Sequence, residues 1–257
     1  CHMSRIEEFA KRLHGAQKQR KAVPQFKENE SFSLKEAYEI QHALINERIK
    51  EGEALIGIKM GFTSEAKMKQ MGVSEMIIGQ LTTSMQYQNG GDISQSNFIH
   101  PRAEPEVYFR LSKDITSPIS LDDCLDYIDG VGAGIEIIDS RYENFKFSLE
   151  DVVADNCSSA AFVTGILHEP KADLKNLHMK MEVNSEQVEE GNSNDILGNP
   201  LKSLVAASEL ALKYQIPLKK GMIVLAGAAT PARFTNENEN INASVESLDS
   251  AFFRTTK

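Results

Sequence analysis

The N-terminal part of the chain carries apolar residues at helical spacing. In residues 4–21 and 33–50 they recur every three or four positions, which predicts two amphipathic helices. Ser33, followed three residues later by Glu36, matches the capping-box pattern of a helix start. Pro24 and the polar residues 27–30 predict a turn between the two helices. We expect the apolar stripes to pack into a core or against another subunit.

From residue 54 onward, short apolar runs separated by glycine replace the helical pattern. Such runs are typical of strands, which we expect at residues 54–61, 101–111, 131–139, 160–165, 177–183, 222–229 and, as one last strand, 241–254. Helices are expected at residues 64–71, after Ser148, and from Asn199 to Tyr214, and a turn at residues 89–92. The pattern predicts a mixed α/β protein, with a helical region over 1–53 and a β-rich region over 54–257 in one continuous structural unit.

Two of the predicted strands carry the most informative residues. Glu104 and Glu106 are two positions apart, and side chains two apart on a strand point to the same face. Glu136 interrupts the apolar run 131–139, which is typical of a strand covered on both faces. A buried carboxylate needs a compensating cation or becomes protonated. The three carboxylates together predict a site for a hard divalent cation, Mg2+ or Mn2+ rather than zinc.

Each of these glutamates also has a simpler interpretation. A Glu-x-Glu pair on a strand most often belongs to a solvated face, and Glu136 could pair with a lysine. The combination favours metal binding, because an acidic pair and a single buried acid on separate strands rarely have independent reasons to lie beside glycine-rich backbone. The positions of the three carboxylates in space decide between these interpretations.

Lys59 is the one charged residue in the apolar run 54–61 and is the second candidate for chemistry. A buried ammonium near a polarised carbonyl can exchange a proton or stabilise developing negative charge. The alternative is a lysine at a strand end whose amine reaches water. Residues 155–159 form a polar cluster that suits hydrogen bonding to a small acid, or alternatively the capping of a turn. We expect His100 and Cys157 to be structural.

The charge balance excludes some classes of partner. The chain has 28 basic and 37 acidic residues, a net charge of −9, which argues against nucleic acid or an anionic membrane as a partner. No apolar stretch approaches the roughly 18 residues of a membrane span. The three cysteines lack Cys-x-x-Cys spacing and are odd in number, which fits a reducing cytoplasm. Cys1 and His2 are interpreted as a cloning remnant and are left out of the chemistry.

Six segments spread over nearly the whole chain resemble one known family. They are Lys59-Met-Gly-Phe-Thr-Ser64, Lys67-Met-Lys-Gln-Met-Gly-Val73, His100-Pro-Arg-Ala-Glu-Pro-Glu106, Ile135-Glu-Ile-Ile-Asp-Ser-Arg-Tyr142, Val153-Ala-Asp-Asn156 with Ser158-Ser159, and Val224-Leu-Ala-Gly-Ala-Ala-Thr230. Their order and content resemble the branch of the fumarylacetoacetate hydrolase superfamily that contains 2-keto-4-pentenoate hydratases and 4-oxalocrotonate decarboxylases.

The resemblance implies a central β-roll or barrel, of the type found in the C-terminal domain of fumarylacetoacetate hydrolase, preceded by an N-terminal helical region. It implies that Mg2+ or Mn2+ is held by Glu104, Glu106 and Glu136, and that Lys59 is the catalytic group above a bound 2-oxo acid. Contacts to that small substrate are expected from four further residues, Thr63, Ser64, Asp155 and Ser158. The resemblance also leads us to expect a homo-oligomer, or a complex with a related hydratase or decarboxylase.

Two reactions of this branch use the same carbonyl group as an electron sink. In decarboxylation of 2-oxo-3-hexenedioate (4-oxalocrotonate) to 2-hydroxypenta-2,4-dienoate, a step in aromatic meta-cleavage catabolism, the electrons released with CO2 travel to the C2 carbonyl. Hydration of 2-hydroxypenta-2,4-dienoate needs an additional acid or base. Hydratases of the branch carry paired aspartates shortly after a Gly-x-Leu, and decarboxylases keep one acid there. Here Gly79-Gln-Leu81 is followed by Thr82-Thr83-Ser84.

The missing acid counts more against hydration, so we expect a decarboxylase and keep the hydratase as the alternative. The same departure also allows a catalytically degenerate chain that binds oxo acids or serves as a partner subunit. A C–C bond hydrolase of the same superfamily would need a His/Glu dyad, which the sequence does not place. The distal end of the substrate is left with three candidate arginines, Arg102, Arg141 and Arg233.

Overall fold

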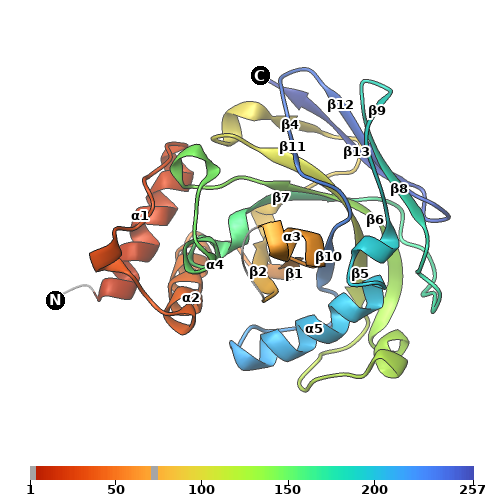
Figure 1. The fold of residues 1–257 in the computed structure, drawn as a ribbon, viewed down its shortest axis with the longest axis horizontal. Helices are drawn as coiled ribbons and strands as arrows, with labels where there is room; N and C mark the ends of the chain where they lie inside the picture. The colour runs from red at the N-terminus through yellow and green to blue at the C-terminus, as the bar shows by residue number, and fades with distance from the viewer. Residues whose placement is uncertain (1–3, 71–74) are drawn as a thin grey trace.

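A curled sheet forms the centre of the molecule in the computed structural model, which describes residues 4–70 and 75–257 (Figure 1). Its strands in these residues are β1 Leu55–Gly61, β2 Ile77–Thr82, β3 Gln86–Tyr87, β5 Arg102–Leu111, β6 Ile128–Ile138, β7 Ser159–Thr164, β10 Ile223–Ala228 and β11 Arg233–Phe234. The strand order is β2-β1-β10-β5-β6-β7-β3, and β11 pairs with β5. The strands β1 and β10 are parallel, whereas β5, β6 and β7 are antiparallel neighbours.

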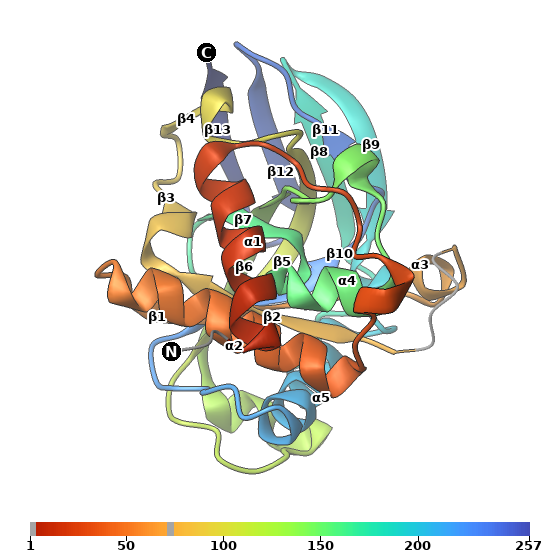
Figure 2. The same cartoon turned by 90° about the vertical axis from the view of Figure 1, so that its left-hand side faces the viewer.

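A second sheet packs against part of the first. Its strands are β4 Asp92–Ser94, β8 His178–Val183, β9 Glu186–Asn192, β12 Asn240–Val245 and β13 Ser250–Thr256, in the order β4-β13-β12-β8-β9. Ile135 and Val163 of the first sheet share a buried apolar cluster with Met181, Ala243 and Phe253 of the second. Figure 2 shows the second sheet at the top of the molecule, above the central strands. The mixed α/β fold with a β-roll-like centre is confirmed.

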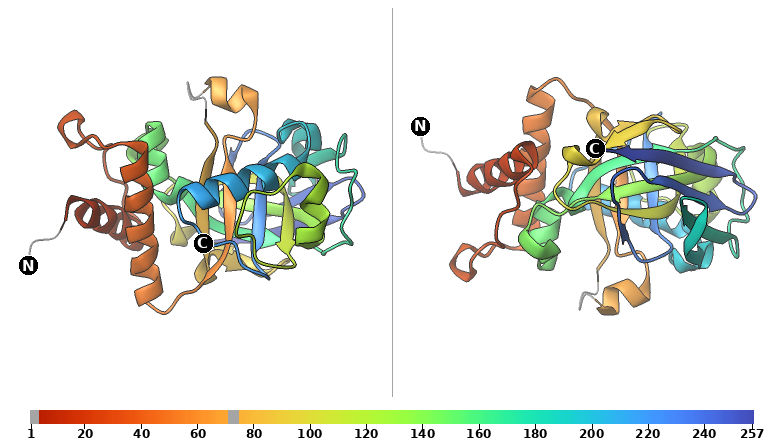
Figure 3. Two further views of the ribbon diagram at one scale, coloured as in Figure 1. Left: turned by 90° about the horizontal axis from the view of Figure 1, so that it is seen from below. Right: turned by 90° about the horizontal axis from the view of Figure 1, so that it is seen from above.

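The helices lie around the sheets, and three of them gather at one end of the molecule. The helices are α1 Arg5–Gln19, α2 Leu34–Lys50, α3 Glu65–Gln70, α4 Leu149–Ala154 and α5 Pro200–Lys213. Figure 3 shows α1, α2 and α4 together at the end of the molecule opposite the second sheet. Ser33 and Glu36 form the expected capping box at the start of α2, and Ser148 and Asp151 form another at the start of α4.

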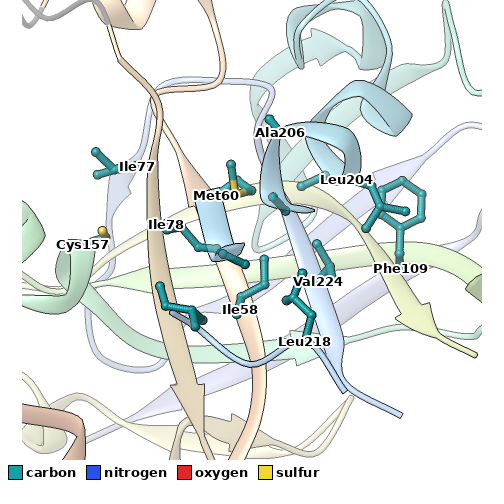
Figure 4. Close-up of a cluster of buried hydrophobic side chains, with 14 of the residues drawn as sticks. Ile58, Met60, Ile77, Ile78, Phe109, Cys157, Leu204, Ala206, Leu218 and Val224 are labelled. Atoms are coloured by element: carbon teal, nitrogen blue, oxygen red, sulfur yellow. The ribbon is translucent and has the colours of Figure 1, made fainter. Parts of the chain in front are cut away.

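The first apolar core joins the N-terminal helices to the central sheet and α5. It contains Phe9 and Leu13 of α1, and among its strand residues are Ile58 and Met60 of β1. Figure 4 shows Ile58 and Met60 in one buried cluster with Leu204 and Ala206 of α5. Because side chains alternate along a strand, Lys59 lies on the opposite face of β1, away from α5. The packing of its two neighbours therefore fixes the direction of Lys59.

The structure corrects several details of the predicted elements. The expected last strand over 241–254 is wrong, because the chain turns back at residues 246–249 and forms β12 and β13 as a hairpin. Glu246, Ser247 and Asp249 of this turn are polar and exposed, but the buried Leu248 interrupts the polar run and weakens its turn signal. The strands β2, β3, β4, β9 and β11 were not expected. The expected end of one helix at residue 71, as well as Cys1 and His2, lies outside the described residues.

Among the helices of residues 4–70 and 75–257, none has both the length and the apolar character that crossing a bilayer requires.

Candidate functional site

The three glutamates meet on adjacent strands of the central sheet. Glu104 of β5 lies opposite Glu136 of β6 in the antiparallel register, and Glu106 follows two residues later on the same face of β5. One carboxylate oxygen from each residue lies within 4.8 Å of the other two. The relative exposures of Glu104, Glu106 and Glu136 are 6%, 0% and 0%, which excludes a solvated acidic face. The alternation of residues 104 and 106 is confirmed, and β-sheet register supplies the third carboxylate.

The electrostatics of this cluster favour a bound cation or a shared proton. Burial, followed by the charges of Glu136 and Glu104, raises the pKa of Glu106 well above its usual value. Burial also raises the pKa of Glu136 against the opposing charge of Lys59. Among the described residues, Oε2 of Glu106 and Oε1 of Glu136 are buried without a hydrogen-bond partner. Unpartnered buried carboxylate oxygens are suitable ligands for a hard divalent ion, and the residues therefore fit Mg2+ or Mn2+.

Gly227 of β10 completes the support of Glu106. Its N–H donates to Oε1 of Glu106 at 3.0 Å. Gly227 has φ +119°, and a Cβ at this position would lie 2.1 Å from Oγ1 of Thr63. Only glycine combines this backbone conformation with the close approach of Thr63. The glycine thereby aims one oxygen of Glu106 at the backbone and leaves the other for the centre of the cluster.

Lys59 is buried beside the glutamates. Its Nζ lies 2.8 Å from Oε2 of Glu136 and donates to the Cys157 carbonyl at 2.8 Å. Burial lowers the pKa of Lys59, but the Glu136 carboxylate and the smaller effects of neighbouring groups, including Glu104, together outweigh it, so the net shift is upward and the ammonium carries its proton at neutral pH. Gly79 lies opposite Lys59 in the β1–β2 register, and a Cβ there would lie 2.9 Å from Cδ of Lys59. The structure excludes the interpretation of Lys59 as a strand-end lysine that reaches water.

A left-handed turn at residues 156–158 shapes the wall next to Lys59. Asn156, Cys157 and Ser158 have φ values of 49°, 55° and 58°. Left-handed backbone costs about 1–2 kcal/mol at each non-glycine residue, so three in succession need strong support. The Asn156 side chain accepts a hydrogen bond from the N–H of Gln80 and donates to its carbonyl, both at 2.8 Å. Since β2 is a terminal strand of its sheet, the amide takes the place of a neighbouring strand at Gln80.

Arg141 supports the same turn from behind. Its Nε donates to Oδ1 of Asp155 at 2.6 Å, and its backbone N–H donates to Oδ2 at 2.9 Å. Its Nη1 and Nη2 donate to the carbonyls of Ser159 and Asp155. Burial raises the pKa of Asp155 to about 6, against the opposing charge of Arg141. Asp155 lines a small separate cavity with Arg48 and Arg141, so its carboxylate holds the turn in place.

A cavity of about 90 Å³ opens above these groups. Its polar lining includes Lys59, Thr63, Lys67, Glu104 and Ser158, and its apolar walls are Phe62, Ile77, Ile138, Phe145, Phe147 and Val152. Within the described chain, the Ser158 hydroxyl is buried without a partner. A small acid in this cavity would meet an ammonium, a hydroxyl and the glutamate cluster at one end and apolar side chains at the other.

Ser64 has a different position from Thr63. Its Oγ accepts a hydrogen bond from the N–H of Lys67 at 3.0 Å, and Ser64 lines a neighbouring cavity of about 250 Å³. His100 donates through its Nε2–H to the Ser140 carbonyl at 2.7 Å, and its backbone N–H donates to Asp139. Burial raises the pKa of the Cys157 thiol to about 12. His100 and Cys157 are therefore structural, as expected.

Sequence reasoning assigned no role to several residues that the structure brings to the site. Lys67 of α3 lies 3.4 Å from Glu104, although 37 residues separate them in sequence. Phe145 and Phe147 also line the cavity. Gln80 supports the left-handed turn from a strand that was not expected. None of these residues lies in a periodic pattern that local sequence analysis would single out.

The segment that departs from the pattern of the hydratases lies in a network of hydrogen bonds. Nη1 of Arg48 donates to Glu53 at 3.2 Å, and Thr82 and Ser84 accept from the same nitrogen. The hydroxyl of Thr83 donates to the Ala54 carbonyl. The side chains at 82–84 are thus engaged by the end of α2 and the start of β1.

Comparison with known proteins gives a consistent result. The sequence matches the fumarylacetoacetate (FAA) hydrolase C-terminal family model over residues 59–252. It is 44% identical over 252 residues to a 4-oxalocrotonate decarboxylase of a Pseudomonas species, with 98% of each chain covered. It is 32% identical over 258 residues to a 2-keto-4-pentenoate hydratase of Paraburkholderia phymatum, with 96% of each chain covered.

Solved structures agree with these relatives. The fold superimposes on the 4-oxalocrotonate decarboxylase from Pseudomonas putida G7, complexed with magnesium and adipate, with a TM-score of 0.93, 32% sequence identity and 99% of each chain covered. The relatives named here are lyases, and the magnesium in that structure agrees with the divalent site formed by the three glutamates. The resemblance found in the sequence motifs is therefore confirmed, and the chain belongs to the fumarylacetoacetate hydrolase family.

Proposed function

We propose that this protein is a divalent-metal-dependent carboxy-lyase that converts 2-oxo-3-hexenedioate to 2-hydroxypenta-2,4-dienoate and CO2. The observation that carries the proposal is the buried cluster of three glutamates beside Lys59, which opens into a cavity with apolar far walls. The high identity to decarboxylases over the full chain supports this reaction over others of the family. The proposed setting is the catabolism of aromatic compounds by meta-cleavage.

When bound at Glu104, Glu106 and Glu136, Mg2+ or Mn2+ would supply a Lewis acid that stabilises negative charge on the C2 carbonyl oxygen of a 2-oxo acid. The side chains of the protein supply the hydrogen bonds and the positive charge that the reaction also needs. An ammonium has three protons to donate; Lys59 donates one to the Cys157 carbonyl, and its charge pairs with the Glu136 carboxylate. We assign another proton to an oxygen of the substrate, where the positive charge stabilises the enolate that forms as CO2 leaves.

Three residues are proposed to bind the substrate, and a fourth is proposed to position one of them. Ser158 donates its free hydroxyl to the C1 carboxylate, since the left-handed turn places it in the cavity. Thr63 lies in the same wall. Ser64 contributes through the neighbouring cavity, and Asp155 acts indirectly by fixing the turn that carries Ser158. The apolar walls exclude water from the carbon chain of the substrate.

The alternative activity is hydration of 2-hydroxypenta-2,4-dienoate, which the identity to hydratases supports. The purified protein with Mg2+ would be assayed for CO2 release from 2-oxo-3-hexenedioate and, separately, for loss of 2-hydroxypenta-2,4-dienoate absorbance. We expect turnover in the first assay. Turnover in the second assay alone would replace the decarboxylase by the hydratase. Metal binding without turnover in either assay would favour a degenerate, substrate-binding partner subunit.

The proposal includes the surroundings in which the protein works. We propose a homo-oligomer, or a complex with a related hydratase that would receive the dienoate product directly. A reducing compartment such as the cytoplasm fits the two buried free thiols, Cys124 and Cys157. Light scattering of the purified protein, alone and with a hydratase of the branch, tests the assembly.

A further inference from the structure

Lys67 borders two cavities. It lines the cavity around Lys59, of about 90 Å³, and also the neighbouring cavity of about 250 Å³, which lies between Ser64, Asp195 and residues 228–231. Its amine therefore lies where a ligand that extends away from the glutamates would pass. A six-carbon acid bound at one end by the glutamate cluster would bring its other end to this region.

The charge of Lys67 is only loosely compensated. Its Nζ lies 3.4 Å from Oε2 of Glu104, and its side chain is 28% exposed. Three glutamates, Lys59 and Lys67 carry one net negative charge, and a divalent cation at the glutamates makes this one net positive charge. The cation would also compete with Lys67 for Glu104 and repel the ammonium. The loaded site is thus cationic and attracts an anionic ligand, and Lys67, whose ion pair with Glu104 is weakened, can bind a carboxylate of that ligand.

The three arginines considered for the distal end of the substrate line neither of these two cavities. Arg102 is stacked between Phe145 and Phe234, with Cζ 3.9 and 4.2 Å from the two ring centroids. Arg141 is bound to Asp155. Arg233 is exposed on β11. Of the cationic side chains considered, Lys67 is the one that shares a cavity with Lys59.

We propose that Lys67 binds the distal carboxylate of the substrate and thereby selects dicarboxylic over monocarboxylic 2-oxo acids. The inference rests on the proposed function, because it assumes that the 2-oxo end of the acid lies at the glutamates. A lysine suits this task, since its ammonium is a compact charge on a flexible stem that can leave Glu104 for a ligand. The ion pair between Lys67 and Glu104 then holds the amine at the cavity until the ligand arrives.

Calorimetric titration of the Mg2+-loaded protein tests this role without turnover. The two probes are 2-oxohexanedioate and 2-oxohexanoate, which are saturated six-carbon acids that differ in the distal carboxylate. We expect the wild type to bind the dicarboxylic acid about tenfold more tightly, as one charge-assisted contact implies. Lys67→Met should lose this preference and keep its affinity for 2-oxohexanoate, whereas Lys67→Arg should keep the preference. Lys69→Met, at an exposed position of the same helix, is the matched control.

The affinity of each variant for Mg2+ is measured first, because Lys67 contacts Glu104. Retention of the preference in Lys67→Met, or an equal loss of affinity for both acids, would overturn the inference. Its failure is separable from that of the proposed function. A wild type that prefers the dicarboxylic acid but does not decarboxylate 2-oxo-3-hexenedioate retains the role of Lys67 and rejects the reaction. A wild type that decarboxylates 2-oxo-3-hexenedioate but does not prefer the dicarboxylic acid supports the reaction and rejects the role of Lys67.

Discussion

Replacement of Asn156 by alanine tests whether the left-handed turn positions the catalytic lysine. The Asn156 side chain makes two hydrogen bonds of 2.8 Å to the backbone of Gln80, and both residues are 1% exposed. Asn156→Ala leaves one buried N–H and one buried carbonyl without partners. Each such loss costs about 1–3 kcal/mol, which gives about 2–6 kcal/mol. We expect about 2–4 kcal/mol, because the smaller side chain leaves space that a water molecule can enter.

The loss should appear in stability and in turnover together. For a chain of 257 residues, about 2–4 kcal/mol corresponds to a decrease in Tm of roughly 4–16 °C. The turn carries the Cys157 carbonyl that accepts from Lys59, so a shift of the turn misplaces the ammonium. A misplacement of about 1 Å can cost on the order of 100-fold in rate. Thermal unfolding and the kcat for decarboxylation, both measured with saturating Mg2+, check these values.

Asn184→Ala is the matched control. Asn184 also has a positive φ, of 52°, and accepts a backbone hydrogen bond from Asn240, but it is exposed on the second sheet. We expect Asn184→Ala to decrease the Tm by less than Asn156→Ala does and to leave kcat unchanged. If Asn156→Ala keeps wild-type Tm and its kcat falls less than twofold, then the turn does not depend on this side chain and the reasoning is refuted.

The remaining predictions concern the glutamates, Lys59 and the metal. Glu106→Gln should lower the affinity for Mg2+ at least about tenfold, whereas Lys59→Ala should bind Mg2+ normally but lose about 10²–10⁴-fold in kcat. Calorimetry measures the first effect and kinetics the second, and a normal Mg2+ affinity of the glutamate variant would remove Glu106 from the site. Gly79→Ala places a Cβ 2.9 Å from Cδ of Lys59, so kcat should fall with a stability cost of about 1–3 kcal/mol, and full activity would show that Lys59 tolerates the shift. Chelation of Mg2+ initially present at about 100 times its Kd should abolish turnover and lower the stability by about 2.7 kcal/mol, read as a decrease in Tm; an unchanged Tm would contradict binding of the ion at the buried cluster.

The predicted strands and helices that proved correct are those with a strong local signal. The capping residues Ser33 and Ser148 begin helices because their side chains accept hydrogen bonds from backbone N–H groups only three positions away. The strand β2 was not expected, because Gly79 and Gln80 weaken its apolar pattern. Both residues meet partners outside the strand, since Gly79 gives room to Lys59 and the Gln80 side chain donates to Oε1 of Gln41 at 3.0 Å.

The sequence likewise predicted only part of the candidate site. Local alternation places Glu104 and Glu106 on one face, and the sequence motifs identify the family and its metal ligands. The left-handed turn has no local signal, because Cys157 and Ser158 are not residues that favour this backbone conformation. The turn exists because Gln80, Arg141 and Lys59 bind it from three separate parts of the chain.

The sequence by itself determined the order of the elements, the side of β5 on which its two carboxylates lie, and the unfavourable isolation of an acid in an apolar strand. Those properties depend on neighbouring residues and on the fixed periods of helix and strand. Tertiary structure alone decided that Glu136 lies opposite Glu104, that Lys59 faces Glu136, and that Lys67 reaches Glu104. Each of these contacts depends on the register of strands or the docking of a helix, and a slip of one residue would turn every side chain of a strand to the opposite face.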